Sequence, residues 1–165
     1  MAVANMEELL INELKDIYSA EKQITKALPK MAKASKSPEL RAAFESHLQE
    51  TLGQIERLDE IFETLGKSPR GKVCHGMQGV IEEGSEVLED TEKGDVRDAA
   101  LISAAQRVEH YEMAAYGCVR EYASLLGQKK VADLLDKTLN EEKAADEKLG
   151  MIAKQVNSGA MKAAA

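Results

Sequence analysis

A recurring pattern of apolar and polar positions runs along the chain. In four stretches a polar residue stands midway between two apolar residues, seven positions from each, and in three stretches it is a glutamate: Leu14–Glu21–Leu28, Phe44–Thr51–Leu58, Ala105–Glu112–Val119 and Leu135–Glu142–Leu149. Seven residues span almost two helical turns, so the central residue points the same way as its apolar partners. We therefore expect the central residues to be buried in one helical core.

Apolar residues at three- and four-residue steps predict four long amphipathic helices, over residues 7–34, 38–65, 96–126 and 129–156. A weaker amphipathic segment over residues 73–88 predicts an additional, shorter helix. Local signals support these boundaries, with Ser37 and Asp95 suited to N-caps and Gly66 to a C-terminal cap. Pro29 lies inside the first helix and predicts a kink or a break there.

The connections between these helices predict the architecture. Short links after the first and third long helices make antiparallel hairpins, while residues 66–93 are long enough to carry the chain to the far end of a bundle. The predicted fold class is all-α: a ferritin-like four-helix bundle of two antiparallel helical hairpins, with a long crossover that contains the additional helix. Residues 48–58 align with residues 139–149, 91 positions later, and the same offset takes Glu21 to Glu112.

Composition favours a single helical domain over residues 1–165. The chain has only three prolines and no tryptophan, and it is rich in the helix formers Ala, Leu, Glu and Lys. Its formal net charge of -7 argues against nucleic acid as a partner, because no basic stripe is available to displace counterions. The residues from about 157 onward are small and have little to bury, so we expect them to fray.

The sequence also bears on the compartment. No stretch approaches the roughly 20 apolar residues that span a membrane, and the first residues lack the basic and apolar regions of a signal peptide. Cys74 and Cys118 match no zinc-binding spacing, and we expect both to be reduced thiols. These features predict a cytoplasmic protein that does not enter the membrane.

Glutamates on the first and third long helices are candidate metal ligands. A di-metal carboxylate site in such a bundle takes one glutamate from each of two helices and a Glu-x-x-His pair from each of the other two. Glu21 and Glu112 occupy the positions of the single glutamates, and Glu109 lies one turn before Glu112. Because several buried ionised carboxylates at one level need a shared counter-charge, a metal site is the sharpest explanation.

The other two long helices match the di-metal pattern only in part. His47 precedes Glu50, so this pair reads His-x-x-Glu, and neither helix carries a histidine three residues after its glutamate. On the last helix Glu142 is central, Asp146 lies one turn further on, and the pattern leaves open whether Glu141 or Glu142 is the ligand. The predicted metal ligands are Glu21, Glu50, Glu112 and Glu142, supplemented by His47, Glu109 and Asp146.

A plainer interpretation competes with the metal site. The glutamates could lie at the edge of the core and pair with side chains such as Tyr18, Tyr111 and Arg107. This interpretation is favoured for any single glutamate, because charge-rich helices often place one near the seam. The coincidence of Glu21, Glu112 and Glu142 at one level favours the metal site. His110 falls opposite the core face, as is typical of a solvated or interface residue.

Motifs on all four long helices resemble those of the YciF family of bacterial stress proteins. They are YSAEKQ at residues 18–23, HLQET at 47–51, EHYE at 109–112 and TLNEE at 138–142. The resemblance extends from about residue 7 to residue 156. It implies a ferritin-like fold related to rubrerythrin and bacterioferritin, a homodimer, and induction under stress, but it supplies no established reaction.

Two functions remain open at this point. In the first, the carboxylates and His47 bind one or two iron or manganese ions, without an organic cofactor, and the centre handles dioxygen or peroxide. In the second, the site is vestigial or holds a structural ion, and the protein acts as a non-catalytic dimer through protein interactions. The missing histidines favour the second function, and the repeated buried carboxylates favour the first.

Overall fold

The computed structural model describes residues 2–163, and its regular elements in this range are all α-helices. In chain order they are α1 (Met6–Ala34), α2 (Pro38–Leu65), α3 (His75–Asp90), α4 (Asp95–Leu125) and α5 (Lys129–Ala163). The predicted all-α class and the additional helix in the long crossover are therefore confirmed. None of the described helices is long and apolar enough to cross a membrane.

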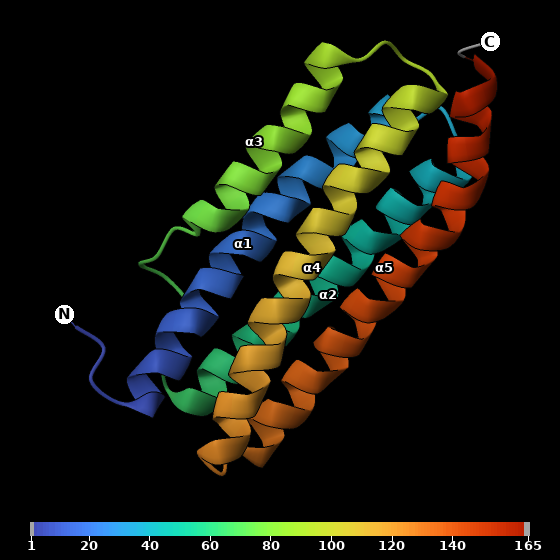
Figure 1. The fold of residues 1–165 in the computed structure, drawn as a ribbon. Helices are drawn as coiled ribbons and strands as arrows, with labels where there is room; N and C mark the ends of the chain where they lie inside the picture. Colours follow the sequence, from blue (N-terminus) through green and yellow to red (C-terminus); the bar gives the residue numbers. More distant parts are fainter. Residues whose placement is uncertain (1, 164–165) are drawn as a thin grey trace.

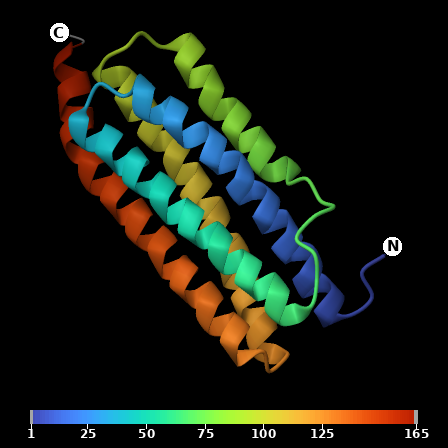
Figure 2. The ribbon, with the colours of Figure 1, turned by 180° about the vertical axis from the view of Figure 1, so that it is seen from behind.

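Two antiparallel hairpins form a four-helix bundle (Figure 1). α1 packs along α2, and α4 packs along α5. The hairpins meet where α1 contacts α4 and where α2 contacts α5, and Figure 2 shows α2 beside α5 on the face that is hidden in Figure 1. The crossover helix α3 lies outside this bundle, against α1 and α4.

Most helix boundaries follow the predicted capping signals. The Ser37 side chain caps α2 by accepting a hydrogen bond from the Leu40 amide, and Gly66 ends that helix in the left-handed conformation, with φ of 62°. α1 continues through Pro29 to Ala34, so the helix does not break there. Gly94 is the N-cap of α4 instead of Asp95, which becomes the first helical residue, where an acidic side chain suits the helix dipole.

α5 is longer than predicted. It extends to Ala163, whereas we expected the helix to end at Val156 and the chain to fray from about residue 157. Val156 is buried in the core, and a Cβ placed on Gly159 would stand 3.0 Å from Asp95 Oδ2. The end of α5 thus packs beside the start of α4, which is a tertiary contact that local composition does not reveal.

The core consists of two apolar clusters separated by a polar layer. All twelve residues of the heptad-spaced pattern are buried, none more than 5% exposed. One cluster contains the residues on one side of the central position, Leu14, Leu58, Val119 and Leu135, and the other contains those on the opposite side, Leu28, Phe44, Ala105 and Leu149. Glu21, Thr51, Glu112 and Glu142 therefore form a layer across the middle of the bundle, as the spacing predicts.

A buried carboxylate holds the turn between α1 and α2. Asp98, on α4, is only 1% exposed, and its two oxygens accept hydrogen bonds from the backbone amides of Lys36 at 2.8 Å and Ser37 at 2.6 Å. These bonds fasten the first hairpin to the second at one end of the bundle. Asp95 lies nearby but makes an ion pair with the more exposed Lys36 side chain, at 2.8 Å.

We expect Asp98→Ala to lower the free energy of unfolding by about 3 kcal/mol, because two amide groups lose a charged acceptor. Asp95→Ala removes only a partly exposed ion pair and should cost less than about 1 kcal/mol. Urea denaturation of both variants measures the difference. Equal losses would show that Asp98 does not fasten the hairpins.

Candidate metal centre

Four buried side chains from three helices converge in the polar layer. α2 contributes His47, α4 contributes Glu109 and Glu112, and α5 contributes Glu142. Each offers one nitrogen or oxygen atom, and these atoms all lie within 4.8 Å of one another. Glu109 and Glu112 are three residues apart on α4, so one helical turn brings both carboxylates to the same face.

Glu21 on α1 brings a further carboxylate to this layer. It is fully buried, and Tyr116 on α4, which is also fully buried, donates a hydrogen bond to Glu21 Oε1. Tyr116 follows Glu112 by one turn on the same helix face. The tyrosine therefore fixes one oxygen of Glu21 and leaves the other, Oε2, without a hydrogen-bond partner among the described residues.

Most carboxylate oxygens of the cluster lack a hydrogen-bond partner among the described residues. Both oxygens of Glu112 and of Glu142, together with Oε2 of Glu109, are buried without a hydrogen bond from the described residues. Within the same part of the chain, no lysine or arginine nitrogen lies within 4.0 Å of these carboxylates. Buried polar atoms are nearly always satisfied in native proteins, so either a bound cation or protons shared between the carboxyl groups must compensate these oxygens.

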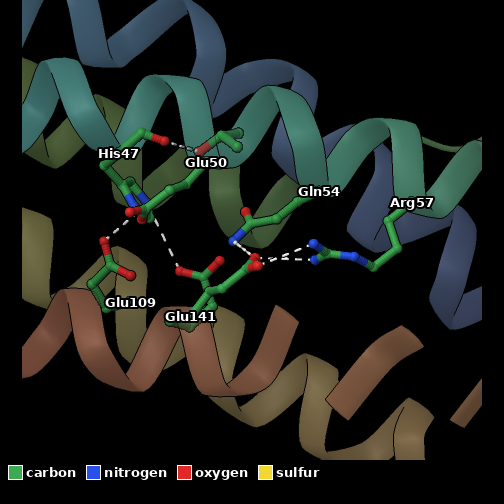
Figure 3. Close-up of polar contacts among 8 residues, drawn as sticks. His47, Glu50, Gln54, Arg57, Glu109 and Glu141 are labelled. Carbon is green, nitrogen blue, oxygen red and sulfur yellow. Dashed lines mark hydrogen bonds and ion pairs between the residues drawn. The ribbon is translucent and has the colours of Figure 1, made fainter. Parts of the chain in front are cut away.

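His47 points one ring nitrogen into the cluster and the other away from it. Nε2 lies 3.2 Å from Glu109 Oε1 and 3.7 Å from Glu142 Oε2, whereas Nδ1 lies 3.3 Å from Glu50 Oε2 (Figure 3). Burial lowers the pKa of His47, but the hydrogen bond with Glu50 and the charge of Glu142 outweigh it and raise the pKa overall. The same bond lowers the pKa of Glu50. Glu50 thus orients the ring from outside the cluster.

The packing of these carboxylates changes their proton affinity. Burial and the charge of Glu142 raise the pKa of Glu21 from its ordinary 4.5 to about 8. Burial also raises the pKa of Glu112 and of Glu109, and neighbouring carboxylates add to both shifts. Near neutral pH the cluster therefore retains protons in the absence of a cation.

Glu141 faces a different set of partners from its neighbour Glu142. Arg57 Nη2 binds Glu141 Oε1 at 3.0 Å and Arg57 Nη1 binds Glu141 Oε2 at 3.0 Å, and Gln54 Nε2 donates to the same Oε2 at 3.2 Å (Figure 3). Arg57 also donates to Thr138. Glu142, which is fully buried, is therefore the α5 residue of the cluster, and Glu141 is an ion-pair partner between α2 and α5.

Not every predicted ligand enters the cluster. Asp146 instead lies between α4 and α5, where it contacts His110 at 3.3 Å and accepts a hydrogen bond from Gln106 at 3.2 Å. These two α4 partners hold the Asp146 side chain outside the group of atoms that converge in the polar layer. Glu50 borders the cluster but its side chain is 45% exposed, and its contact is with His47. Glu21, His47, Glu109, Glu112 and Glu142 lie in the interior.

The tyrosines and arginine that we considered as alternative partners of the glutamates have other contacts, and Tyr18 packs edge-on against Phe62. Tyr111 contacts Cys74 and Asp16, and Arg107 is exposed on α4. The ion pairing expected by the plainer interpretation does occur, but between Arg57 and Glu141. Sequence reasoning missed Arg57 and Tyr116, although the position of Tyr116 four residues after Glu112 was a signal that it shares the core face.

The donor set fits a transition-metal ion. Carboxylate oxygens with one imidazole nitrogen suit iron and manganese, and a divalent ion would satisfy the orphaned oxygens and offset their charge. The orientation of His47 by Glu50 is the arrangement that metal-binding histidines commonly show.

Comparison with known proteins gives a consistent result. The protein YciF of Escherichia coli K12 is 52% identical over 155 residues, which cover 93% of each chain. The crystal structure of the E. coli stress protein YciF superimposes with a TM-score of 0.92 at 49% identity, over 94% of this chain and 99% of that one. A ferritin-like, diiron-carboxylate protein of Bacillus anthracis, at 18% identity, covers 92% of this chain and 99% of its own with a TM-score of 0.71.

These likenesses settle the fold and the family. The match to the Bacillus anthracis structure confirms the predicted ferritin-like architecture. The family described as a domain of unknown function, DUF892, matches residues 5–161. This chain therefore belongs to the DUF892 family, and YciF of E. coli is one of its relatives.

Proposed function

We propose that this chain is a stress-associated protein that binds one or two iron or manganese ions inside its helical bundle and handles peroxide or dioxygen there. The observation that carries the proposal is the convergence of His47 with Glu109, Glu112 and Glu142, whose buried oxygens lack partners within residues 2–163. The description of the E. coli relative as a stress protein supports the proposed association with stress.

Each residue of the cluster has a distinct role in this proposal. His47 Nε2 and the carboxylates of Glu109, Glu112 and Glu142 hold the metal, with Glu21 as a further oxygen donor. Glu50 holds the His47 ring through Nδ1. Tyr116 keeps a proton beside Glu21 through their hydrogen bond, and the two apolar clusters above and below the layer limit the access of water.

Iron or manganese, when bound, would supply the electrons for reduction of peroxide or dioxygen. The chain itself provides a buried site in which carboxylates can take up or give back protons, because burial and mutual repulsion raise the pKa values of Glu21, Glu109 and Glu112. Oxidant reduction consumes protons, so a reservoir of carboxyl protons at neutral pH suits this chemistry.

A second candidate function is a non-catalytic dimeric stress protein with a structural ion. The observation that favours it is the asymmetry of the two hairpins. On α2, His47 enters the cluster and Glu50 orients its ring, whereas the equivalent positions on α5 are Thr138 and Glu141, which Arg57 binds. Metal binding without consumption of peroxide, by a protein that is dimeric in solution, would favour this second function.

We expect Fe²⁺ or Mn²⁺ to raise the melting temperature of the wild-type protein, because the ion binds only the folded state. The gain is about 2.7 kcal/mol at a free metal concentration of about 100 times Kd. Glu112→Gln should abolish the increase, while Glu56→Gln, at an exposed site on α2, should keep it. Differential scanning calorimetry gives the measurement, and an increase that survives in Glu112→Gln would contradict the assigned ligands.

Without metal, removing the charge of Glu112 should not destabilise the protein. Near about pH 8, Glu112→Gln should be at least as stable as the wild type, because a neutral amide needs no proton to be buried. If Glu112 instead belonged to a structural ion pair, its loss would cost about 3–5 kcal/mol. Urea denaturation in the presence of a chelator distinguishes the two results.

The stability of the metal-free protein should fall as the pH rises from about 5 to about 8. The folded-state pKa of Glu21 is about 8, above its ordinary 4.5, so between these values the folded protein holds more protons than the unfolded chain. Stability therefore decreases with pH, and the raised pKa of His47 acts in the same direction. Unfolding free energies measured across this range provide the test, and stability that rises throughout would show that the carboxylates do not share protons.

A further inference from the structure

A cavity of about 490 Å³ opens beside the metal cluster, and the proposed function does not account for it. Residues of all five helices line it. Most of its wall is apolar, and the apolar side chains include Ile24, Phe44 and Leu149. Its volume falls within the range of small-molecule sites, which are concave and mostly apolar.

The cavity meets the metal cluster at two residues. His47 and Glu109 belong to its wall, whereas Glu21, Glu112 and Glu142 are not part of the described lining. Glu109 Oε2 is buried without a hydrogen-bond partner in residues 2–163. A molecule in the cavity therefore has polar atoms of the centre at one part of its surface and apolar side chains around most of the remainder.

The charged groups of the wall carry both signs. Three lysines and four glutamates belong to it, and Arg57 binds one of these glutamates, Glu141. Two of the lysines are on α1 and Glu82 is on the neighbouring α3, while Lys148 is on α5 and Glu50 is on the neighbouring α2. Because neither sign predominates, electrostatic attraction does not select an ion, and the apolar wall favours a neutral molecule.

We propose that this cavity binds the hydrocarbon group of an alkyl or aryl hydroperoxide, and that this hydroperoxide is the oxidant that the metal centre reduces. The hydrocarbon group lies among the apolar side chains, and the peroxide group lies at His47 and Glu109. The inference rests on the proposed function, because the cavity selects the organic group and the metal supplies the chemistry. Hydrogen peroxide has no apolar part and gains nothing from the same wall.

The reaction balances with Fe²⁺ as the reductant. The O–O bond of the hydroperoxide ROOH breaks, two Fe²⁺ ions supply one electron each, and two protons come from water. The products are the alcohol ROH, one water molecule and two Fe³⁺ ions. The alcohol keeps the hydrocarbon group, so it binds the same cavity and reports its occupancy without any metal.

Calorimetric titration of chelator-treated full-length protein with cumyl alcohol, the product of cumene hydroperoxide, tests the cavity separately from the metal. We expect saturable binding at one site per chain. Binding of tert-butanol should be at least about tenfold weaker, because this alcohol lacks the phenyl ring that the apolar wall would bury. Absence of saturable binding, or equal binding of the two alcohols, would overturn the proposal.

Matched substitutions locate the alcohol. Ala27 lines the cavity on α1, and Ala27→Leu should weaken binding of cumyl alcohol about tenfold by filling the space, whereas Ala42→Leu, at an exposed site of α2 outside the described lining, should leave it within about twofold. Gly84→Leu in the wall on α3 and Gly79→Leu outside it form a second pair with the same expected contrast. Leucine is a strong helix former, so all four variants should fold. Equal effects within both pairs would place the alcohol outside the cavity and contradict the proposal.

Stopped-flow mixing of anaerobic, Fe²⁺-loaded protein with each peroxide separates this inference from the proposed function. Cumene hydroperoxide should oxidise the iron at least about tenfold faster than hydrogen peroxide at equal concentration, and Ala27→Leu should slow only the organic peroxide. Glu112→Gln gives the background from iron outside the site. No oxidation above that background with either peroxide would reject the proposed function together with this inference, whereas oxidation by hydrogen peroxide without preference for the organic peroxide would reject this inference alone.

Discussion

The cost of burying carboxylates is the constraint on which the rest of this structure depends. Removing even one ionised carboxylate from water costs several kcal/mol unless a partner compensates it, and here Glu21, Glu109, Glu112 and Glu142 share one layer. Protons can neutralise them, as the raised pKa values of Glu21, Glu109 and Glu112 indicate, and so can a metal ion. The apolar clusters on both sides must supply the stability that this layer removes.

The two hairpins have diverged from their internal repeat, and the divergence defines the site. Glu21 and Glu112 have kept equivalent positions, whereas Thr51 on α2 corresponds to Glu142 on α5. On one side of the layer His47 faces the cluster, and on the other side Arg57 and Gln54 bind Glu141 between α2 and α5. The proposed metal is consequently held mainly by the second hairpin and His47.

Periodicity predicted the buried layer because a seven-residue step returns to the same helix face, whatever the neighbouring helices contain. It could not separate Glu141 from Glu142, because adjacent residues both lie near the seam and only the position of Arg57 on α2 decides which one forms an ion pair. The same ambiguity applies to Asp146, which periodicity assigns to the site although it contacts His110 on α4. The end of α5 lies beyond the predicted position because its contact with Asp95 depends on the packing of two helices. Local sequence determined the helices, and the relative rotation of the helices determined the site.

The most direct test of the metal centre is the anomalous difference density of crystals soaked with Mn²⁺. The account predicts a peak inside the bundle, in contact with His47 Nε2 and with carboxylate oxygens of Glu109, Glu112 and Glu142, and loss of that peak in Glu112→Gln crystals. Density confined to surface carboxylates such as Asp146, with an empty interior in the wild-type protein, would contradict the account and leave the buried layer as a set of protonated side chains.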